Sequence, residues 1–154
     1  MSPLHETLRF TREVSAPRAA LWEAFAEPSQ RVIWAVPAGE IQVYNQAQFE
    51  IGGQDRYRCG PPGSLDYRGL VDYLQIIDQE LIVHTDVVHA EDQILSAALL
   101  TVEFSSTTCG SRIEVTDQLV SFVGEGMVQG HQTGQRMALD QLAAYLKSRH
   151  RQKE

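Results

Sequence analysis

The sequence lacks most of the patterns that assign a protein to a catalytic or cofactor-binding class. No nucleophile elbow, phosphate-binding loop or zinc-protease helix occurs in its 154 residues. Its only cysteines, Cys59 and Cys109, are too few for a disulfide scaffold and have no cysteine or histidine neighbour at zinc-finger spacing, so we predict free thiols. We therefore predict no cofactor and no metal centre, and the sequence leaves open whether the protein is an enzyme.

Long apolar runs and positive charge are also scarce. No segment approaches the roughly 20 apolar residues that a membrane helix needs, and the first residues have no basic patch followed by an apolar core. With 13 Lys and Arg residues against 20 Asp and Glu residues, the formal net charge is −7, which opposes binding to nucleic acids and anionic membranes. We expect a cytoplasmic protein that binds neither nucleic acid nor membrane.

The chain does have the length and composition of one globular domain, which we place over residues 1–154. Hydrophobic residues make up 43% of it, enough for a substantial core. Apolar and polar residues alternate from Leu8 to Val14, which predicts a first strand. Ser15 is the predicted cap of a helix whose first turn contains Pro17. Pro28 then starts a second, shorter helix.

From Ile41 to Val120 the period falls to two, which predicts about six short strands. Short turn clusters separate them, and successive short connections favour an antiparallel meander. We interpret Gly52-Gly53 as a bend that lets the sheet curl. The candidate inward-facing sets are Phe49/Ile51, Leu65/Tyr67, Leu100/Val102/Phe104 and Ile113/Val115.

A helical period returns after Gly124, with Gln135, Leu139, Leu142 and Leu146 on one face. The sequence therefore predicts an α+β fold, in which a curved antiparallel sheet of about seven strands wraps around a long C-terminal helix and two short helices follow the first strand. Because the short helices cannot fill the whole concave face, we expect a groove or cavity between the sheet and the last helix.

Six groups of residues, taken in order, carry a resemblance to known proteins: Arg12–Pro17 with Leu21-Trp22, Pro28 with Trp34 and Pro37, Phe49–Gly53, Leu74–Asp78 with Leu81–Thr85, Ser111–Ile113, and Gly134 before Leu139/Leu142/Leu146. Together they resemble the START-like (SRPBCC, Bet v 1-like) superfamily, and within it the homologues of the activator of the heat-shock-protein-90 ATPase. The resemblance covers nearly the whole chain and implies the helix-grip fold.

Two positions depart from the pattern of such proteins. Where they usually carry Gly-Trp at the start of the last helix, this chain has Gly134-Gln135. Where their fifth strand often ends in Thr-Trp, this chain has Thr85-Asp86. Both changes replace an aromatic ring with a smaller polar side chain. The resemblance therefore implies a cavity that is larger and wetter than is typical for the family.

The resemblance does not imply one activity. Eukaryotic members named after the chaperone activator carry a separate chaperone-binding N-terminal domain, for which this chain is too short, so no chaperone role is carried over. The superfamily also includes lipid carriers, hormone receptors, polyketide cyclases and aromatases, and a fold alone does not choose among them.

Polar residues on the predicted inward faces are the candidates for chemistry. Asp55 and Tyr57 alternate with two arginines that we place in solvent, and the same alternation turns Asp117 inward. His84 and Asp86 share a face, but the opposite face of their strand is the more apolar, so the phase of that strand stays open. No catalytic residue is predicted. The predicted cavity-lining residues are Trp34, Phe49, Asp55, Tyr57, Tyr67, His84, Asp86, Asp117, Met127, His131 and Gln135.

Three functions are compatible with these residues. The first is binding of a small apolar or amphipathic molecule in the cavity. The second is an enzyme of cyclase, dehydratase or hydrolase type, in which inward acids and histidines act as general acid and base, although the same groups could bind a cationic ligand or a divalent metal. The third is a homodimeric interaction module that pairs through an apolar outer patch of Tyr44, Tyr73, Ile82 and Val88.

Overall fold

The computed structural model describes residues 2–152, and the side chains of residues 2–149. The order of elements is the predicted one, with one strand, two short helices, six strands and a long helix within the described residues. Their bounds are β1 (Leu4–Val14), α1 (Arg18–Ala26), α2 (Pro28–Trp34), β2 (Ile41–Ala47), β3 (Gln54–Gly60), β4 (Tyr67–Ile77), β5 (Leu81–Ala90), β6 (Gln93–Thr107), β7 (Gly110–Ser121) and α3 (Glu125–Gln152).

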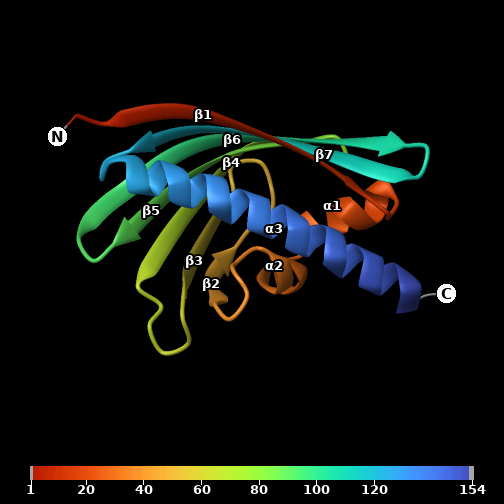
Figure 1. Cartoon of the computed structure of the whole chain (residues 1–154), viewed down its shortest axis with the longest axis horizontal. Coiled ribbons are helices and arrows are strands. Elements are labelled where there is room, and N and C mark those ends of the chain that lie inside the picture. The colour runs from red at the N-terminus through yellow and green to blue at the C-terminus, as the bar shows by residue number, and fades with distance from the viewer. Residues whose placement is uncertain (1, 153–154) are drawn as a thin grey trace.

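The strands of the described residues form one antiparallel sheet in the order β1-β7-β6-β5-β4-β3-β2. Figure 1 shows this sheet curling around α3, which crosses its concave side, while α1 and α2 lie toward one end of the sheet. This is the helix-grip arrangement, so the predicted α+β fold is confirmed. The sheet edges are β1 and β2, and all the other strands are paired on both sides.

The two short helices lie where the prolines predict them, but the cap of α1 is not Ser15. Pro17 holds the N-cap position, its carbonyl accepts hydrogen bonds from Ala20 and Leu21, and no side chain caps the helix. Because the first helical residue is Arg18, Ser15 lies outside the position from which a side chain can reach the free amides. At the start of α2, Pro28 occupies the first turn, where its missing N–H costs no helix bond.

The connection between β2 and β3 is a loop, which overturns two predictions. Residues 48–53 form no strand, so Phe49 and Ile51 are not an inward pair: Ile51 is 61% exposed, whereas Phe49 packs against the core. Gly52, with a φ of +82°, helps close this loop and donates to the Tyr73 carbonyl, so the glycines do not bend a strand. The irregularities in strand register lie instead at Tyr44/Gln46, Tyr73/Gln75 and Val88/His89.

The predicted period of two is confirmed in the centre of the sheet and fails at one end of it. In β6 and β7 the expected residues are buried: Leu100, Val102, Phe104, Ile113 and Val115. The pair Leu65/Tyr67 was wrong, because Leu65 lies in the loop before β4 and Tyr67, at the first position of that strand, is 42% exposed. Tyr67 has the parity of the buried Val71 and Tyr73, but it lies at the hairpin end of the strand.

Helix α3 packs one apolar face into the core. It begins at Glu125, so Gly134 and Gln135 lie within the helix and not at its start. The predicted apolar stripe is confirmed, since Leu139, Leu142 and Leu146 are 5%, 0% and 2% exposed. Full burial of a leucine side chain contributes about 1.5–3 kcal/mol. None of the described helices is long and apolar enough to cross a membrane.

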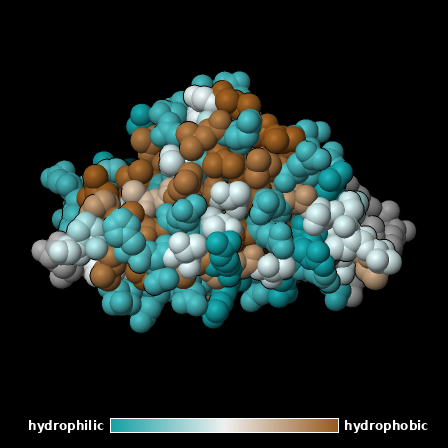
Figure 2. Space-filling model, turned by 90° about the horizontal axis from the view of Figure 1, so that it is seen from above, coloured by the Kyte–Doolittle hydropathy of each residue, from teal (hydrophilic) through white to brown (hydrophobic). Residues whose placement is uncertain are grey.

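The residues predicted to form an apolar outer patch do not form one. Tyr73 and Ile82 are 5% and 2% exposed and belong to the core, because β4 and β5 turn these positions toward the concave side. Among the apolar side chains that are exposed are Leu74 and Ile77 of β4. In the view of Figure 2, hydrophobic residues gather in the upper middle of the face, and hydrophilic residues border them. Homodimerisation itself stays a prediction.

Candidate functional site

A cavity of about 210 Å³, partly open to solvent, lies between the concave face of the sheet and helices α2 and α3. Its apolar lining includes Trp34, Phe49, Val71, Leu100, Val102 and Leu139. Its polar lining includes Arg31, Tyr44, Tyr57, His84, Asp86 and Gln135. The site therefore combines an apolar body with several hydrogen-bonding groups.

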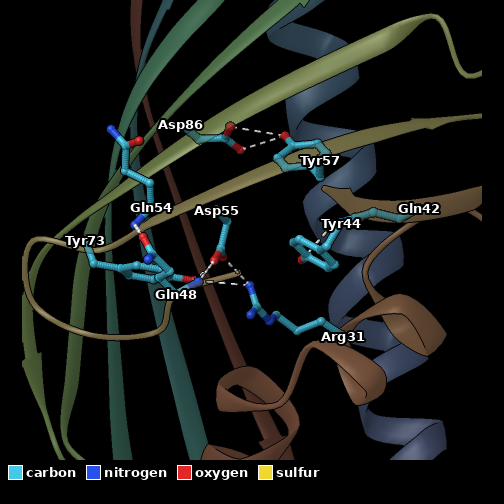
Figure 3. Close-up of polar contacts among 9 residues, drawn as sticks. All are labelled: Arg31, Gln42, Tyr44, Gln48, Gln54, Asp55, Tyr57, Tyr73 and Asp86. Atoms are coloured by element: carbon cyan, nitrogen blue, oxygen red, sulfur yellow. Dashed lines mark hydrogen bonds and ion pairs between the residues drawn. The ribbon is translucent and has the colours of Figure 1, made fainter. Parts of the chain in front are cut away.

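A buried ion pair between Arg31 and Asp55 lies at the polar part of the cavity lining. Arg31 reaches from α2 and donates through Nη1 to Oδ2 of Asp55 at 2.6 Å and to the Tyr73 hydroxyl at 3.1 Å (Figure 3). Asp55, which is 0% exposed, also accepts from Tyr73 at 2.5 Å and from the backbone N–H of Gln48 at 3.0 Å. Arg31 lines the cavity, while Asp55 lies behind it. Asp55 is therefore the residue that orients the guanidinium.

A second polar pair, Tyr57 and Asp86, belongs to the same lining. The Tyr57 hydroxyl lies 3.1 Å from both carboxylate oxygens of Asp86 (Figure 3). Burial raises the pKa of Asp86 to about 6, with the Tyr57 hydrogen bond opposing the rise. Burial, followed by the charge of Asp86, raises the pKa of Tyr57 well above its ordinary value. Tyr57 therefore stays protonated and donates, and Asp86 titrates just below neutral pH.

We expect Asp86→Asn to stabilise the fold by about 3 kcal/mol at pH 8. Because the pKa of Asp86 rises from 3.8 to about 6 on folding, its ionised form is disfavoured in the native state. The free energy of unfolding of the wild-type protein therefore falls as the pH rises from about 4 through 6. The Asn variant does not show this fall, because asparagine does not titrate. Urea unfolding at several pH values should show the gain shrinking toward zero near pH 4. Asp92→Asn, on an exposed turn, is the control, and a pH-independent gain for Asp86→Asn would contradict the assignment.

A glycine on the neighbouring strand makes room for the Tyr57 ring. Gly69 pairs with Tyr57 across β3 and β4, and a Cβ placed on Gly69 would lie 1.9 Å from the ring. The Tyr57 side chain can therefore lie flat across the sheet only because position 69 has no side chain. Sequence reasoning assigned no role to this glycine, since its spacing carries no signal without the strand register.

We expect Gly69→Ala to destabilise the fold by about 2 kcal/mol, because the Tyr57 ring must move away from Asp86 to relieve the overlap. Gly134→Ala is the matched control, since a Cβ there meets nothing within 4 Å and the change favours a helix by about 1 kcal/mol. Guanidinium denaturation followed by circular dichroism measures both. If Gly69→Ala and Gly134→Ala changed the free energy of unfolding equally and in the same direction, the Tyr57 ring would not need the space at Gly69.

The open phase of β5 is decided in favour of the polar face. Ile82, His84 and Asp86 all line the cavity. Burial lowers the pKa of His84 to about 4, so its ring is neutral near pH 7. Its Nδ1 atom is buried and has no hydrogen-bond partner among the described residues. A neutral imidazole has one donor and one acceptor, so His84 can bind a polar group in the cavity.

Three further polar residues resemble a catalytic triad but lie outside the cavity lining. His131 is 2.9 Å from Asp117 through Nδ1 and 3.4 Å from the Ser96 hydroxyl through Nε2. Ser96 and Asp117 are both 0% exposed, so the hydroxyl cannot meet a substrate as a nucleophile does. We interpret this cluster as a polar contact that fixes α3 to β6 and β7.

The predicted site residues therefore fall into three groups. Those that line the cavity are Trp34, Phe49, Tyr57, His84, Asp86 and Gln135. Asp55, Asp117 and His131 are inward but make bonds beside the cavity lining. Met127 is half-buried on the first turn of α3, and Tyr67 is exposed at the end of β4, so neither belongs to the lining.

Arg31 is the main functional candidate that sequence reasoning missed. The sequence places it three residues before Trp34, one helical turn away, and both side chains are buried. That spacing was the available signal, but an arginine beside apolar neighbours in a short helix is ordinarily assigned to solvent. Ile33 occupies the solvent side instead, with 58% exposure.

No group of three His, Cys, Asp or Glu side chains in the described part of the chain is arranged to hold a metal ion. Cys59 and Cys109 are free thiols, as predicted. Burial raises the pKa of the Cys59 thiol to about 11, which keeps it protonated and a poor nucleophile near neutral pH.

Comparison with known proteins finds one matching family model and several solved structures with the same fold. The model of the family described as Activator of Hsp90 ATPase homolog 1-like protein matches residues 15–147. The fold is similar to that of a putative uncharacterized protein from Rhizobium leguminosarum (26% identity, TM-score 0.86, covering 96% of this chain and 97% of that one). It is also similar to a protein from Rhizobium loti (26% identity, TM-score 0.83, 94% and 99% covered). An AHSA1 protein from Silicibacter pomeroyi shares the fold at 18% identity (TM-score 0.78, 94% and 100% covered). No match was found among the curated proteins.

Proposed function

The chain belongs to the family of activator of Hsp90 ATPase homolog 1-like proteins, and we propose that it binds a small amphipathic molecule in the cavity between the sheet and α3. Membership of this family means that the chain is a START-like domain, and binding of small ligands is the general expectation for such domains. The observation that carries the proposal for this chain is the cavity itself, with an aromatic and aliphatic body and a polar wall.

The size of the cavity limits the ligand. An apolar cavity of about 150 Å³ is enough to hold benzene, and pockets for drug-sized molecules have about 300–1,000 Å³. At about 210 Å³, this cavity suits a molecule with one ring, or an alkyl chain of similar volume, and a short polar arm. Such a ligand would place its apolar part against residues such as Leu100 and Leu139.

Titration with phenylacetamide, a neutral compound of this size, tests the proposal. In ¹H–¹⁵N and methyl spectra we expect saturable shifts at lining residues such as Val71, Leu100 and Leu139. Residues of the surface groove formed by β1 and β7, such as Thr7 and Val120, serve as an internal control and should not shift. Shifts scattered over the surface would contradict the proposal, and the absence of shifts at millimolar phenylacetamide would contradict it for neutral ligands of this size.

A further inference from the structure

Arg31 makes hydrogen bonds with only one of its three side-chain nitrogens among the described residues. Nη1 donates to Asp55 and Tyr73, whereas Nε and Nη2 are buried and have no partner. Buried donors are almost always paired, and an unpaired donor on a charged group costs the most free energy. The side chain is 10% exposed and lines the cavity, so the missing partner is expected to come from the cavity's contents.

The free edge of the guanidinium has the geometry of a carboxylate site. The N–H groups of Nε and Nη2 lie in one plane on the same side of the guanidinium, and they match the two oxygens of a carboxylate. The guanidinium carbon lies 4.8 Å from the centre of the Tyr44 ring, which is a cation–π contact and not a hydrogen bond to Nε or Nη2. Asp55 and Tyr73 occupy Nη1, so the Nε–Nη2 edge is the part of the guanidinium that is left without a partner among the described residues.

The balance of unused groups favours an anion over a neutral or cationic group. Asp55 already accepts hydrogen bonds from Arg31, Tyr73 and the Gln48 backbone. Two donor nitrogens of Arg31, in contrast, have no acceptor among the described residues. His84 adds an unpartnered Nδ1 to the same lining. Asp86, the lining carboxylate, is paired with the Tyr57 hydroxyl. Because Asp86 repels each negative charge on a ligand, a monoanion that pairs with Arg31 is favoured over a dianion.

We propose that the polar end of the ligand is a carboxylate bound by the Nε–Nη2 edge of Arg31. This inference rests on the proposed function, because it assigns the ligand class of the same cavity. Together with the cavity volume of about 210 Å³, it defines a monocarboxylate with a single ring or a short alkyl body. Arg31 fixes the carboxylate, and the apolar lining receives the body.

Isothermal titration calorimetry with phenylacetate and phenylacetamide, which have nearly the same shape, tests this inference. We expect the wild-type protein to bind the acid at least about tenfold more tightly than the amide at pH 7.5. Arg31→Lys keeps a positive charge for Asp55 but removes the planar edge, so the acid should then bind within about threefold of the amide. Arg56→Lys, on the exposed face of β3, is the matched control and should leave the tenfold ratio unchanged.

A second measurement does not depend on any variant. In protein labelled with ¹⁵N-arginine, the Nε–H resonance of Arg31 should shift on addition of phenylacetate and should shift much less with phenylacetamide. Equal affinity for acid and amide, or an unmoved Arg31 resonance at saturating acid, overturns the carboxylate inference and leaves the proposed function standing. Tighter binding of phenethylamine than of phenylacetate also overturns it and points to Asp86. Binding of none of the three removes the proposed function, and the inference with it.

Discussion

Replacement of Asp55 by alanine is expected to lower the free energy of unfolding by about 3–5 kcal/mol. The carboxylate is 0% exposed and is the counter-charge of Arg31, at 2.6 Å. Without it, the guanidinium stays in the core with no charge partner, and the Tyr73 hydroxyl loses its acceptor. Urea unfolding followed by circular dichroism gives the value.

Two controls separate this effect from the loss of any carboxylate. Asp92→Ala, on the exposed turn between β5 and β6, should change stability by less than about 0.5 kcal/mol. The double variant Arg31→Met/Asp55→Leu removes both charges and should recover most of the lost stability, since apolar residues of similar volume replace buried ion pairs well. If Asp55→Ala costs no more than Asp92→Ala, the pair does not support the fold.

Replacement of Gln135 by tryptophan is expected to weaken binding of phenylacetamide by at least about 100-fold, which corresponds to ~2.8 kcal/mol. Gln135 lines the cavity from α3, at the position where the resemblance to the family implies a tryptophan in other members. The indole ring would occupy space that the ligand needs, while the resemblance indicates that the fold accepts it. Calorimetry on the folded variant measures the loss.

Arg136→Trp is the matched control for this change. Its position is the next one on α3 and is exposed, so the same ring is added on the solvent side of the helix. The control should bind phenylacetamide like the wild-type protein and melt within a few degrees of it. Unchanged affinity in Gln135→Trp would show that the ligand binds elsewhere.

The fold could be predicted because its periods are strong and local. The alternation from Ile113 to Val115 in β7, the stripe from Leu139 to Leu146 in α3 and the prolines at the starts of the short helices each depend only on neighbours in sequence. Where prediction failed, a turn decided the outcome. Residues 48–53 alternate like a strand, yet the backbone of Gly52 and Gly53 bonds to Tyr73 and closes a loop.

The site could be predicted only in part, because alternation fixes the face of a residue but not its partners. Asp55 was assigned inward on this basis, and it is fully buried. Its partner Arg31 lies 24 positions away on a short helix, and nothing in the spacing of the two residues indicates the ion pair. The same holds for Gly69, whose role depends on its register with Tyr57.

The most direct test of the central claim is a set of intermolecular nuclear Overhauser effects between bound phenylacetamide and methyl-labelled protein. If the cavity between the sheet and α3 is the ligand site, the ring protons will show contacts to the methyl groups of Val71, Leu100 and Leu139. These three residues belong to β4, β6 and α3, so only a ligand inside the cavity can touch all of them. Contacts confined to exposed residues such as Leu74 and Ile77 would contradict the account.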